Sequence, residues 1–462
     1  MSSMDREVVR AAARERRLDA ELAEVLRVPL ASPVGSPGLG ERPRSSWLAA
    51  AVVLLGLGVA AGVALLHGAG QDAMAQDPAW DDVVDPPYER FEQWLDVDGA
   101  ALASTAKDAD CLRVRLADPA DLDRLAGFDR LRALSLTWAD GAQKGGLLGE
   151  ATLRVLTSLP SLDKLYLADG LLCDAGQLRA LRTAPRLREL RLQGAALDPA
   201  LARALVELPR IAHLQLYDGT ATAEGIAVLE GLPELTVLEL RSVDIDAGVV
   251  LAIGRLRTLR VIKLYGTGLA TPWLSDAGAR AFCELPHLTA VWLRSVTLEA
   301  GALAALPKDL TWLGLESVNG VDADALRGVA TQLPGLKGLT LRLSQDEIPV
   351  AAELVRKLPL QRFRYSGNPS KALWAALAGK ASLRALDLKL FSAPPSVLAH
   401  VLELPAVERL FVLGGPPAAS DLAPLREHPR LRTVDWMLVP PGELPDLGSA
   451  LGPGIRLRSV WP

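Results

Sequence analysis

The sequence predicts an α/β solenoid, in which parallel strands line the concave side of a curved array and short helices line the convex side, preceded by a single transmembrane helix. Two observations predict this arrangement. A short leucine pattern recurs at nearly constant spacing through most of the chain, and one uncharged stretch of about twenty residues stands before it. The 462 residues are 50% hydrophobic but only 5% aromatic, which is typical of repeat proteins with aliphatic cores.

Residues 1–46 are predicted to form a cytoplasmic helix followed by a flexible tether. Residues 5–27 are rich in helix-forming residues, and their apolar positions fall roughly on one face. Pro29 ends this run, and Pro, Gly and Ser then dominate as far as Ser46. The helix has two open interpretations: it docks on a cytoplasmic partner, or it is a solvated helix without one.

Residues 47–66 form the predicted transmembrane helix, because no charged side chain interrupts a length that crosses a bilayer. Arg42 and Arg44 precede this stretch, whereas the residues directly after it are acidic. The positive-inside rule therefore places the N-terminus in the cytoplasm and the repeats outside it. Gly58 and Gly62 form a GxxxG pair, a spacing that allows two such helices to pack closely as a homodimer.

A signal-peptidase site of the A-x-A type gives a rival interpretation of this segment. Cleavage after Ala75, before Gln76, would release the repeats as a secreted domain. Signal peptides usually have a shorter apolar region and a shorter leader, so we favour an uncleaved anchor. Residues 67–105 are then a linker and N-terminal cap region.

Residues 106–462 carry the recurring pattern LxxLxL, and most copies start 22–26 residues apart. The copies start at Leu131, Leu162, Leu187, Ile211, Leu235, Leu259, Leu288, Leu310, Leu336, Leu360, Leu383, Val407 and Leu431. A Leu-Pro pair precedes many copies and ends the preceding helix. Asp-Ala-Gly corners at Asp174, Asp246 and Asp276 are suited to cap the helix starts, because Asp accepts a backbone N–H there.

The pattern resembles the leucine-rich-repeat superfamily, in particular the strand-plus-helix subtype of ribonuclease-inhibitor-like and many bacterial repeat proteins. The resemblance covers about residues 110–462. The family often places Asn three residues after the last Leu of the motif, and only Asn368 matches this here. Elsewhere the position holds Ala195, Gly219, Val243, Thr267 or Val296. The hydrogen bonds of this turn must therefore be made in another way.

Side chains alternate across a strand, so the polar positions of LxxLxL should face the concave surface. We predict a partner-binding site made of Tyr166, Arg191, Tyr217, Arg241, Lys263, Tyr265, Trp292, Arg294, Trp312, Arg342, Arg362 and Arg364. Tyr, Trp and Arg dominate binding hot spots, and Lys and Arg outnumber acids about two to one on this face. The hypothesis is that an acidic or carbohydrate-bearing partner binds here, with Trp292 and Trp312 as central anchors. The alternative is that bulky side chains only cover the sheet and support their neighbours.

No catalytic motif of the HExxH, GxxxxGK or GxSxG type is present, so we expect a protein that is not an enzyme and needs no cofactor. The three cysteines are far apart and the histidines lack metal-ligand spacing. A net charge of -5 gives no overall case for nucleic acid. Three functions remain open: a membrane-anchored recognition module, a single-pass signal transducer acting through the N-terminal helix, and a structural envelope or adhesion protein.

Overall fold

The computed structural model describes residues 94–105, 107–139, 150–168, 175–266, 274–343, 348–390, 395–413, 417–437, 444–452 and 454–460. The chain divides into two units, residues 1–64 and 65–462, and every described residue belongs to the second. The predicted cytoplasmic helix, the transmembrane helix with Gly58 and Gly62, and the cleavage site before Gln76 lie outside the described residues. Within the described ranges, no helix is long and apolar enough to cross a membrane.

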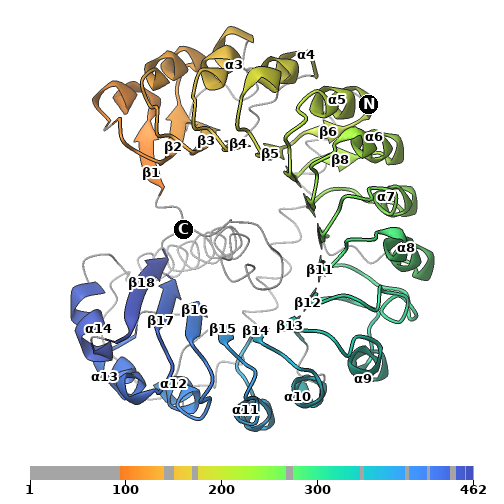
Figure 1. The fold of residues 1–462 in the computed structure, drawn as a ribbon, viewed down its shortest axis with the longest axis vertical. Helices are drawn as coiled ribbons and strands as arrows, with labels where there is room; N and C mark the ends of the chain where they lie inside the picture. Colours follow the sequence, from red (N-terminus) through yellow and green to blue (C-terminus); the bar gives the residue numbers. More distant parts are fainter. Residues whose placement is uncertain are drawn as a thin grey trace, which may run out of the picture. The chain divides into compact units, whose positions relative to one another are not determined.

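Sixteen described strands form one parallel sheet whose order follows the order of the chain (Figure 1). They are β1 (Leu95–Asp98), β2 (Cys111–Leu116), β3 (Ala133–Trp138), β4 (Lys164–Leu167), β5 (Glu189–Gln193), β7 (His213–Tyr217), β9 (Val237–Arg241), β10 (Val261–Tyr265), β11 (Ala290–Arg294), β12 (Trp312–Glu316), β13 (Gly338–Arg342), β14 (Arg362–Ser366), β15 (Ala385–Lys389), β16 (Arg409–Leu413), β17 (Thr433–Met437) and β18 (Arg456–Val460). A second, two-stranded sheet pairs β6 (Ala196–Leu197) with β8 (Thr220–Ala221). Sequential parallel stacking is what a solenoid requires, since each repeat contacts its neighbours.

Short helices occupy the side of the array opposite the strands (Figure 1). The α-helices are α3 (Glu150–Thr157), α4 (Ala175–Leu178), α5 (Pro199–Val206), α6 (Ala223–Val228), α7 (Ala247–Ile253), α8 (Asp276–Ala281), α9 (Ala323–Gln332), α10 (Ile348–Lys357), α11 (Lys371–Ala378), α12 (Pro395–Val401), α13 (Ala419–Leu422) and α14 (Leu444–Leu451). The 3₁₀ helices are η2 (Gly99–Ser104), η3 (Pro119–Leu125), η4 (Arg179–Thr183), η5 (Leu229–Gly231), η6 (Phe282–Glu284) and η8 (Ala423–Glu427). The strands line the concave side and the helices the convex side, which confirms the predicted solenoid of strand-plus-helix repeats.

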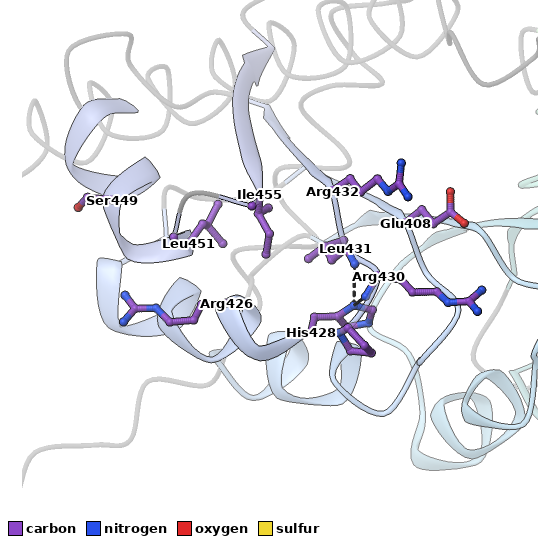
Figure 2. A pocket seen from close by; sticks show the side chains of 12 residues that line it. Glu408, Arg426, His428, Arg430, Leu431, Arg432, Ser449, Leu451 and Ile455 are labelled. Atoms are coloured by element: carbon purple, nitrogen blue, oxygen red, sulfur yellow. Dashed lines mark hydrogen bonds between the residues drawn. The ribbon is translucent and has the colours of Figure 1, made fainter.

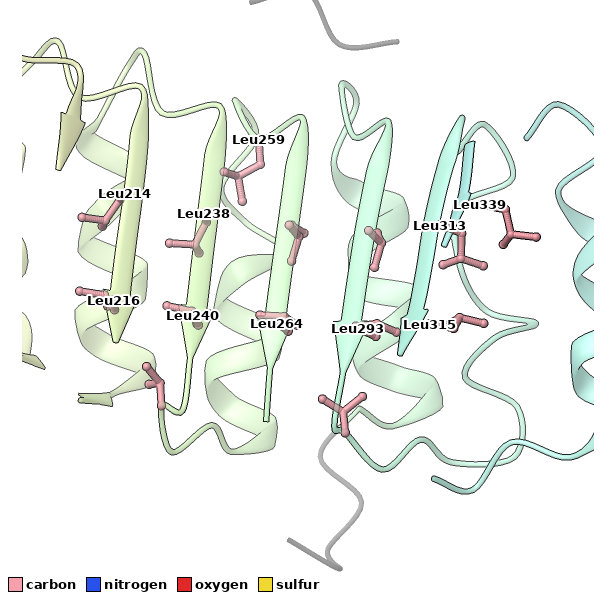
Figure 3. Packing of buried hydrophobic residues seen from close by; sticks show 14 of the residues in the cluster. Leu214, Leu216, Leu238, Leu240, Leu259, Leu264, Leu293, Leu313, Leu315 and Leu339 are labelled. Atoms are coloured by element: carbon pink, nitrogen blue, oxygen red, sulfur yellow. The ribbon is translucent and has the colours of Figure 1, made fainter. Parts of the chain in front are cut away.

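The regular spacing of leucines builds one aliphatic core between the strands and the helices (Figure 3). The register places Leu214 beside Leu238 and Leu216 beside Leu240, and the same ladders continue through the later strands. These four side chains are fully buried. Complete burial of a Leu side chain stabilises the fold by roughly 1.5–3 kcal/mol, so the repeated ladder is the main source of stability.

Polar N-caps determine where the helices begin. The Asp246 carboxylate accepts a hydrogen bond of 2.8 Å from the backbone N–H three residues later, as its Asp-Ala-Gly corner predicts. At the corner that contains Asp276 the prediction is wrong by one residue. Ser275 has the extended backbone of an N-cap there and accepts the equivalent bond at 3.1 Å, so Asp276 lies inside the first turn. Asp174 lies outside the described residues.

Backbone hydrogen bonds between neighbouring repeats fix the turns that follow several strands. Ser242, Ser295 and Ser317 directly follow β9, β11 and β12 and adopt left-handed φ values of 48°, 50° and 52°. Their N–H groups donate to the carbonyl that ends the next strand, at 2.8–3.0 Å. The apolar Val243 and Val296, which stand where Asn was expected, are buried in these turns.

Candidate functional site

Each central strand presents three side chains on the concave face, at its first, third and fifth positions. From β4 to β15 the strands pair in register, so equivalent positions form continuous columns with neighbours about 4.8 Å apart. All twelve residues of the predicted site lie in these columns, on the side of the sheet opposite the leucine ladders. Their role in binding a partner stays a prediction.

Glu189 on β5 is the centre of the first polar cluster on this face. Its carboxylate accepts hydrogen bonds from the Tyr166 hydroxyl at 2.8 Å and from the Gln215 amide at 2.9 Å. His213 and Lys164 approach the same carboxylate at 3.5 Å and 3.7 Å. Burial alone would raise the pKa of Glu189, but the surrounding cations and donors outweigh it and hold the pKa below its ordinary value.

Glu239 on β9 is the centre of a second cluster and is fully buried. Arg241 on the same strand pairs with it, and Lys263 on β10 lies 3.4 Å away. The Tyr217 hydroxyl lies 3.5 Å from the carboxylate, and His213 lies 3.9 Å from it, so His213 joins the two clusters. Burial opposes ionisation, but Arg241 and Lys263 hold the pKa of Glu239 well below its ordinary value.

Arginines and tyrosines alternate along this part of the face. The Arg191 guanidinium lies 5.6 Å from the Tyr166 ring and 3.8 Å from the Tyr217 ring. Arg241 lies 4.9 Å from the Tyr217 ring and 4.5 Å from the Tyr265 ring. Cation–π contacts of this kind contribute about 0.5–2 kcal/mol each. The predicted hot-spot residues thus hold one another in place.

Two tryptophans form the floor of the middle of the face. The Trp292 and Trp312 ring centres are 5.6 Å apart, and the Trp292 indole N–H donates to Glu316 at 3.2 Å. Each indole extends over a glycine of the next strand, Gly314 or Gly338, where a Cβ atom would overlap the ring. The two residues are only 3% and 0% exposed, so their rings do not project from the face as anchors would.

Asp387 on β15 is a residue that sequence reasoning missed. Its Oδ2 accepts from Arg362 at 2.7 Å and from Arg364 at 3.1 Å, and the carboxylate is fully buried. The same arginines lie 5.6 Å from the Trp312 ring and 5.3 Å from the Trp292 ring. Asp387 therefore fixes the two cations over the tryptophan floor. Its place beside Arg364 in the third-position column is a signal that aligning the repeats could have found.

Only part of the predicted site is open to solvent. Arg191, Tyr265, Arg294 and Arg342 keep intermediate exposure, whereas the other eight residues are buried. Three of these four residues are arginines. Arg191 stands at the third position of its strand, and Tyr265, Arg294 and Arg342 stand at the fifth position of theirs. A partner approaching the face would therefore meet these side chains first.

A separate cavity of about 870 Å³ lies in the last repeats, where Arg426, Arg430 and Arg432 line it with Glu408 and His428 (Figure 2). His428 accepts from the Leu431 N–H at 2.9 Å through Nδ1, and its Nε2 lies 2.9 Å from a backbone carbonyl. Burial lowers the pKa of this histidine, and its two contacts suit a neutral imidazole that stabilises the turn before β17. Among the described residues, no cluster of His, Cys, Asp or Glu could hold a metal ion.

No known family model matches the chain, and no curated protein matches it. Among solved structures, the chain is similar to the plant peptide hormone receptor RGFR1 in complex with RGF2, at 15% identity and a TM-score of 0.29 over 77% of this chain. The match spans 59% of the receptor chain, less than two thirds of its length. An internalin (inlF) from Listeria monocytogenes matches at 14% identity and a TM-score of 0.30, over 68% of this chain and 86% of the internalin. The structure itself shows a solenoid of parallel strand-plus-helix repeats that follows the leucine spacing of the sequence.

Proposed function

We propose that this chain is a recognition protein that binds a partner protein through the concave face of its solenoid, with cations making the first contacts. The observation that carries the proposal is the distribution of charge on that face. Glu189, Glu239, Glu316 and Asp387 are all buried and lie against cations, whereas Arg191, Arg294 and Arg342 remain partly exposed.

The accessible charge of the face is therefore positive, although the whole chain carries a net charge of -5. A positive concave surface attracts an acidic partner and increases its association rate. The network beneath the exposed side chains favours binding further, because side chains already fixed by ion pairs and ring contacts lose less conformational entropy on association.

Attachment to a membrane is the second part of the proposal. The uncharged stretch of residues 47–66 and the basic residues before it support a single-pass anchor with the repeats outside the cytoplasm. Intact-mass measurement of the protein extracted from membranes tests this. A mature chain that starts at Gln76 would replace the anchor by a secreted domain.

Two other roles stay open beside simple recognition. The Gly58 and Gly62 pair and the amphipathic residues 5–27 support a signal transducer, and a cytoplasmic partner of residues 1–28 would favour it. A structural envelope or adhesion role is favoured if no ligand binds but surface contacts fail without the protein.

Crosslinking in cells tests partner recognition. A photoreactive group placed at Tyr265 should capture a partner, and the double variant Tyr265→Ala/Arg294→Ala should lose binding in a pull-down. These two residues are neighbours in the register of β10 and β11. Arg203→Ala, an exposed cation on the convex helix α5, is the matched control and should bind normally. Unchanged binding of the double variant, or binding that does not weaken with added salt, contradicts the proposal.

A further inference from the structure

Three adjacent strands gather six polar side chains in one block of the concave face. The β13–β15 block consists of Thr340 and Arg342 on β13, Arg364 and Ser366 on β14, and Asp387 and Lys389 on β15. The register places Thr340 beside Arg364, and Ser366 beside Lys389. Because strand neighbours are about 4.8 Å apart, the six side chains form one continuous patch across three adjacent strands.

Positive charge exceeds negative charge in this block. The acid Asp387 is held by Arg362 and Arg364, at 2.7 Å and 3.0 Å. Lys389 has no carboxylate within ion-pair distance in the part of the chain that the structure describes. Burial lowers the pKa of Lys389 to about 8 by removing water from its ammonium, and nearby arginines lower it further by repulsion, which Glu316 opposes in part.

Two hydroxyl groups in the block lack hydrogen-bond partners among the described residues. They are the Oγ1 atom of Thr340 and the Oγ atom of Ser366, whose residues are 0% and 5% exposed. Buried hydroxyls nearly always have a partner, because an unpaired buried donor costs free energy. One oxygen of Asp387 is unpaired as well, and its charge offsets only one of the surrounding cations.

We propose that the β13–β15 block binds a tetrahedral oxyanion, the phosphate or sulfate ester of a partner protein, with Arg342 and Lys389 supplying positive charge and Thr340 and Ser366 donating hydrogen bonds. A tetrahedral group carries three terminal oxygens, so it accepts bonds from several strands at once, whereas a carboxylate has only two oxygens. Arg294 on β11 lies 3.9 Å from Glu316 on β12, which the register places beside Arg342 of the block. The inference rests on the proposed function, because it names the group that the partner presents.

Small probes test the site on the full-length protein without any partner. O-phosphoserine and O-sulfotyrosine are titrated calorimetrically, with aspartate as a carboxylate probe and chloride as a control for ionic strength. We expect saturable binding of at least one ester and no comparable binding of aspartate or chloride. The ester that binds more tightly identifies the modification on the partner. Equal responses to all four anions would overturn the proposal.

Substitutions assign the binding to this block. Lys389→Gln should weaken ester binding by about tenfold or more, and Ser366→Ala combined with Thr340→Val should weaken it by a similar factor. Thr137→Val and Arg409→Gln remove a hydroxyl and a cation from other strands of the same face, and both should bind normally. Ester binding that survives both block variants contradicts the site.

Two further measurements distinguish loss of binding from loss of folding. Denaturant unfolding of each variant without ligand shows whether it folds, and NMR of labelled lysine should show the pKa of Lys389 rising when the ester binds. If no ester binds while the Tyr265→Ala/Arg294→Ala variant still loses its partner, the oxyanion site is wrong and the proposed function stands. If the ester binds but that variant keeps its partner, the oxyanion site stands and the proposed function is wrong.

Discussion

The Trp312 indole lies over Gly338 of the next strand, at a position where any side chain would overlap the ring. Trp292 has the same relationship with Gly314, one strand earlier. Each large aromatic residue is thus matched by a residue without a side chain at the neighbouring position of its own column. The tryptophan floor depends on this pairing as much as on the tryptophans themselves.

Replacement of Gly338 tests the pairing. Gly338→Ala should destabilise the protein by about 1–3 kcal/mol, because the new methyl group must displace the fully buried Trp312 ring. Urea unfolding followed by tryptophan fluorescence measures the change. Gly335→Ala, at an exposed turn where a Cβ meets no atom within 4 Å, is the matched control and should be nearly neutral. Equal effects of the two variants would contradict the pairing.

Asp387 allows a comparison of a buried ion pair with an exposed one. Asp387→Ala should cost about 3–5 kcal/mol, because it leaves the buried guanidinium groups of Arg362 and Arg364 without their carboxylate. Glu408→Ala breaks the exposed pair with Arg384, whose distance is 2.8 Å, and should cost less than about 1 kcal/mol. Denaturant midpoints of the two variants give the comparison, and similar losses would show that burial does not determine the strength of the Asp387 contacts.

Much of the fold could be predicted because it depends on the regular spacing of leucines along the chain. Leucines every 22–26 residues specify the stack, and strand alternation places Trp292 and Arg364 on the face opposite the core. The number of concave side chains that would be buried could not be predicted from one repeat, since it depends on what stands beside each residue in the next strand. Gly338 and Asp387 show this: each acts on a neighbour that is 23 to 26 residues away in sequence.

The acidic clusters predict how stability depends on low pH. The pKa of Glu239 is held well below its ordinary value in the folded protein, mainly by Arg241 and Lys263 against the opposing effect of burial. A depressed folded-state pKa stabilises the protein at pH values above the unfolded-state pKa, and this stabilisation is lost as the pH falls below about 4.5. Glu239→Gln should therefore be less stable than the unmodified protein at pH 7, and the difference should shrink toward pH 3. Chemical unfolding over this range measures it, and a difference that stays constant with pH would exclude the ionised carboxylate as the cause.

Lys389 predicts how stability depends on pH in the alkaline range. Burial and nearby arginines lower its pKa from 10.5 to about 8, so between these values the unfolded chain binds a proton that the folded protein has lost. Stability should then rise with pH across this interval, because the unfolded state binds more protons, by up to roughly 3 kcal/mol in total. Lys389→Met removes the group and should flatten the rise relative to the unmodified protein. Lys371→Met, on an exposed lysine at the start of the convex helix α11, serves as the control because its ammonium is open to solvent and lies away from the concave arginines. If the free energy of unfolding of Lys389→Met changes with pH in parallel with that of the unmodified protein from pH 8 to 10.5, this lysine is not held among like charges. That result would also remove the electrostatic support for an oxyanion in the block.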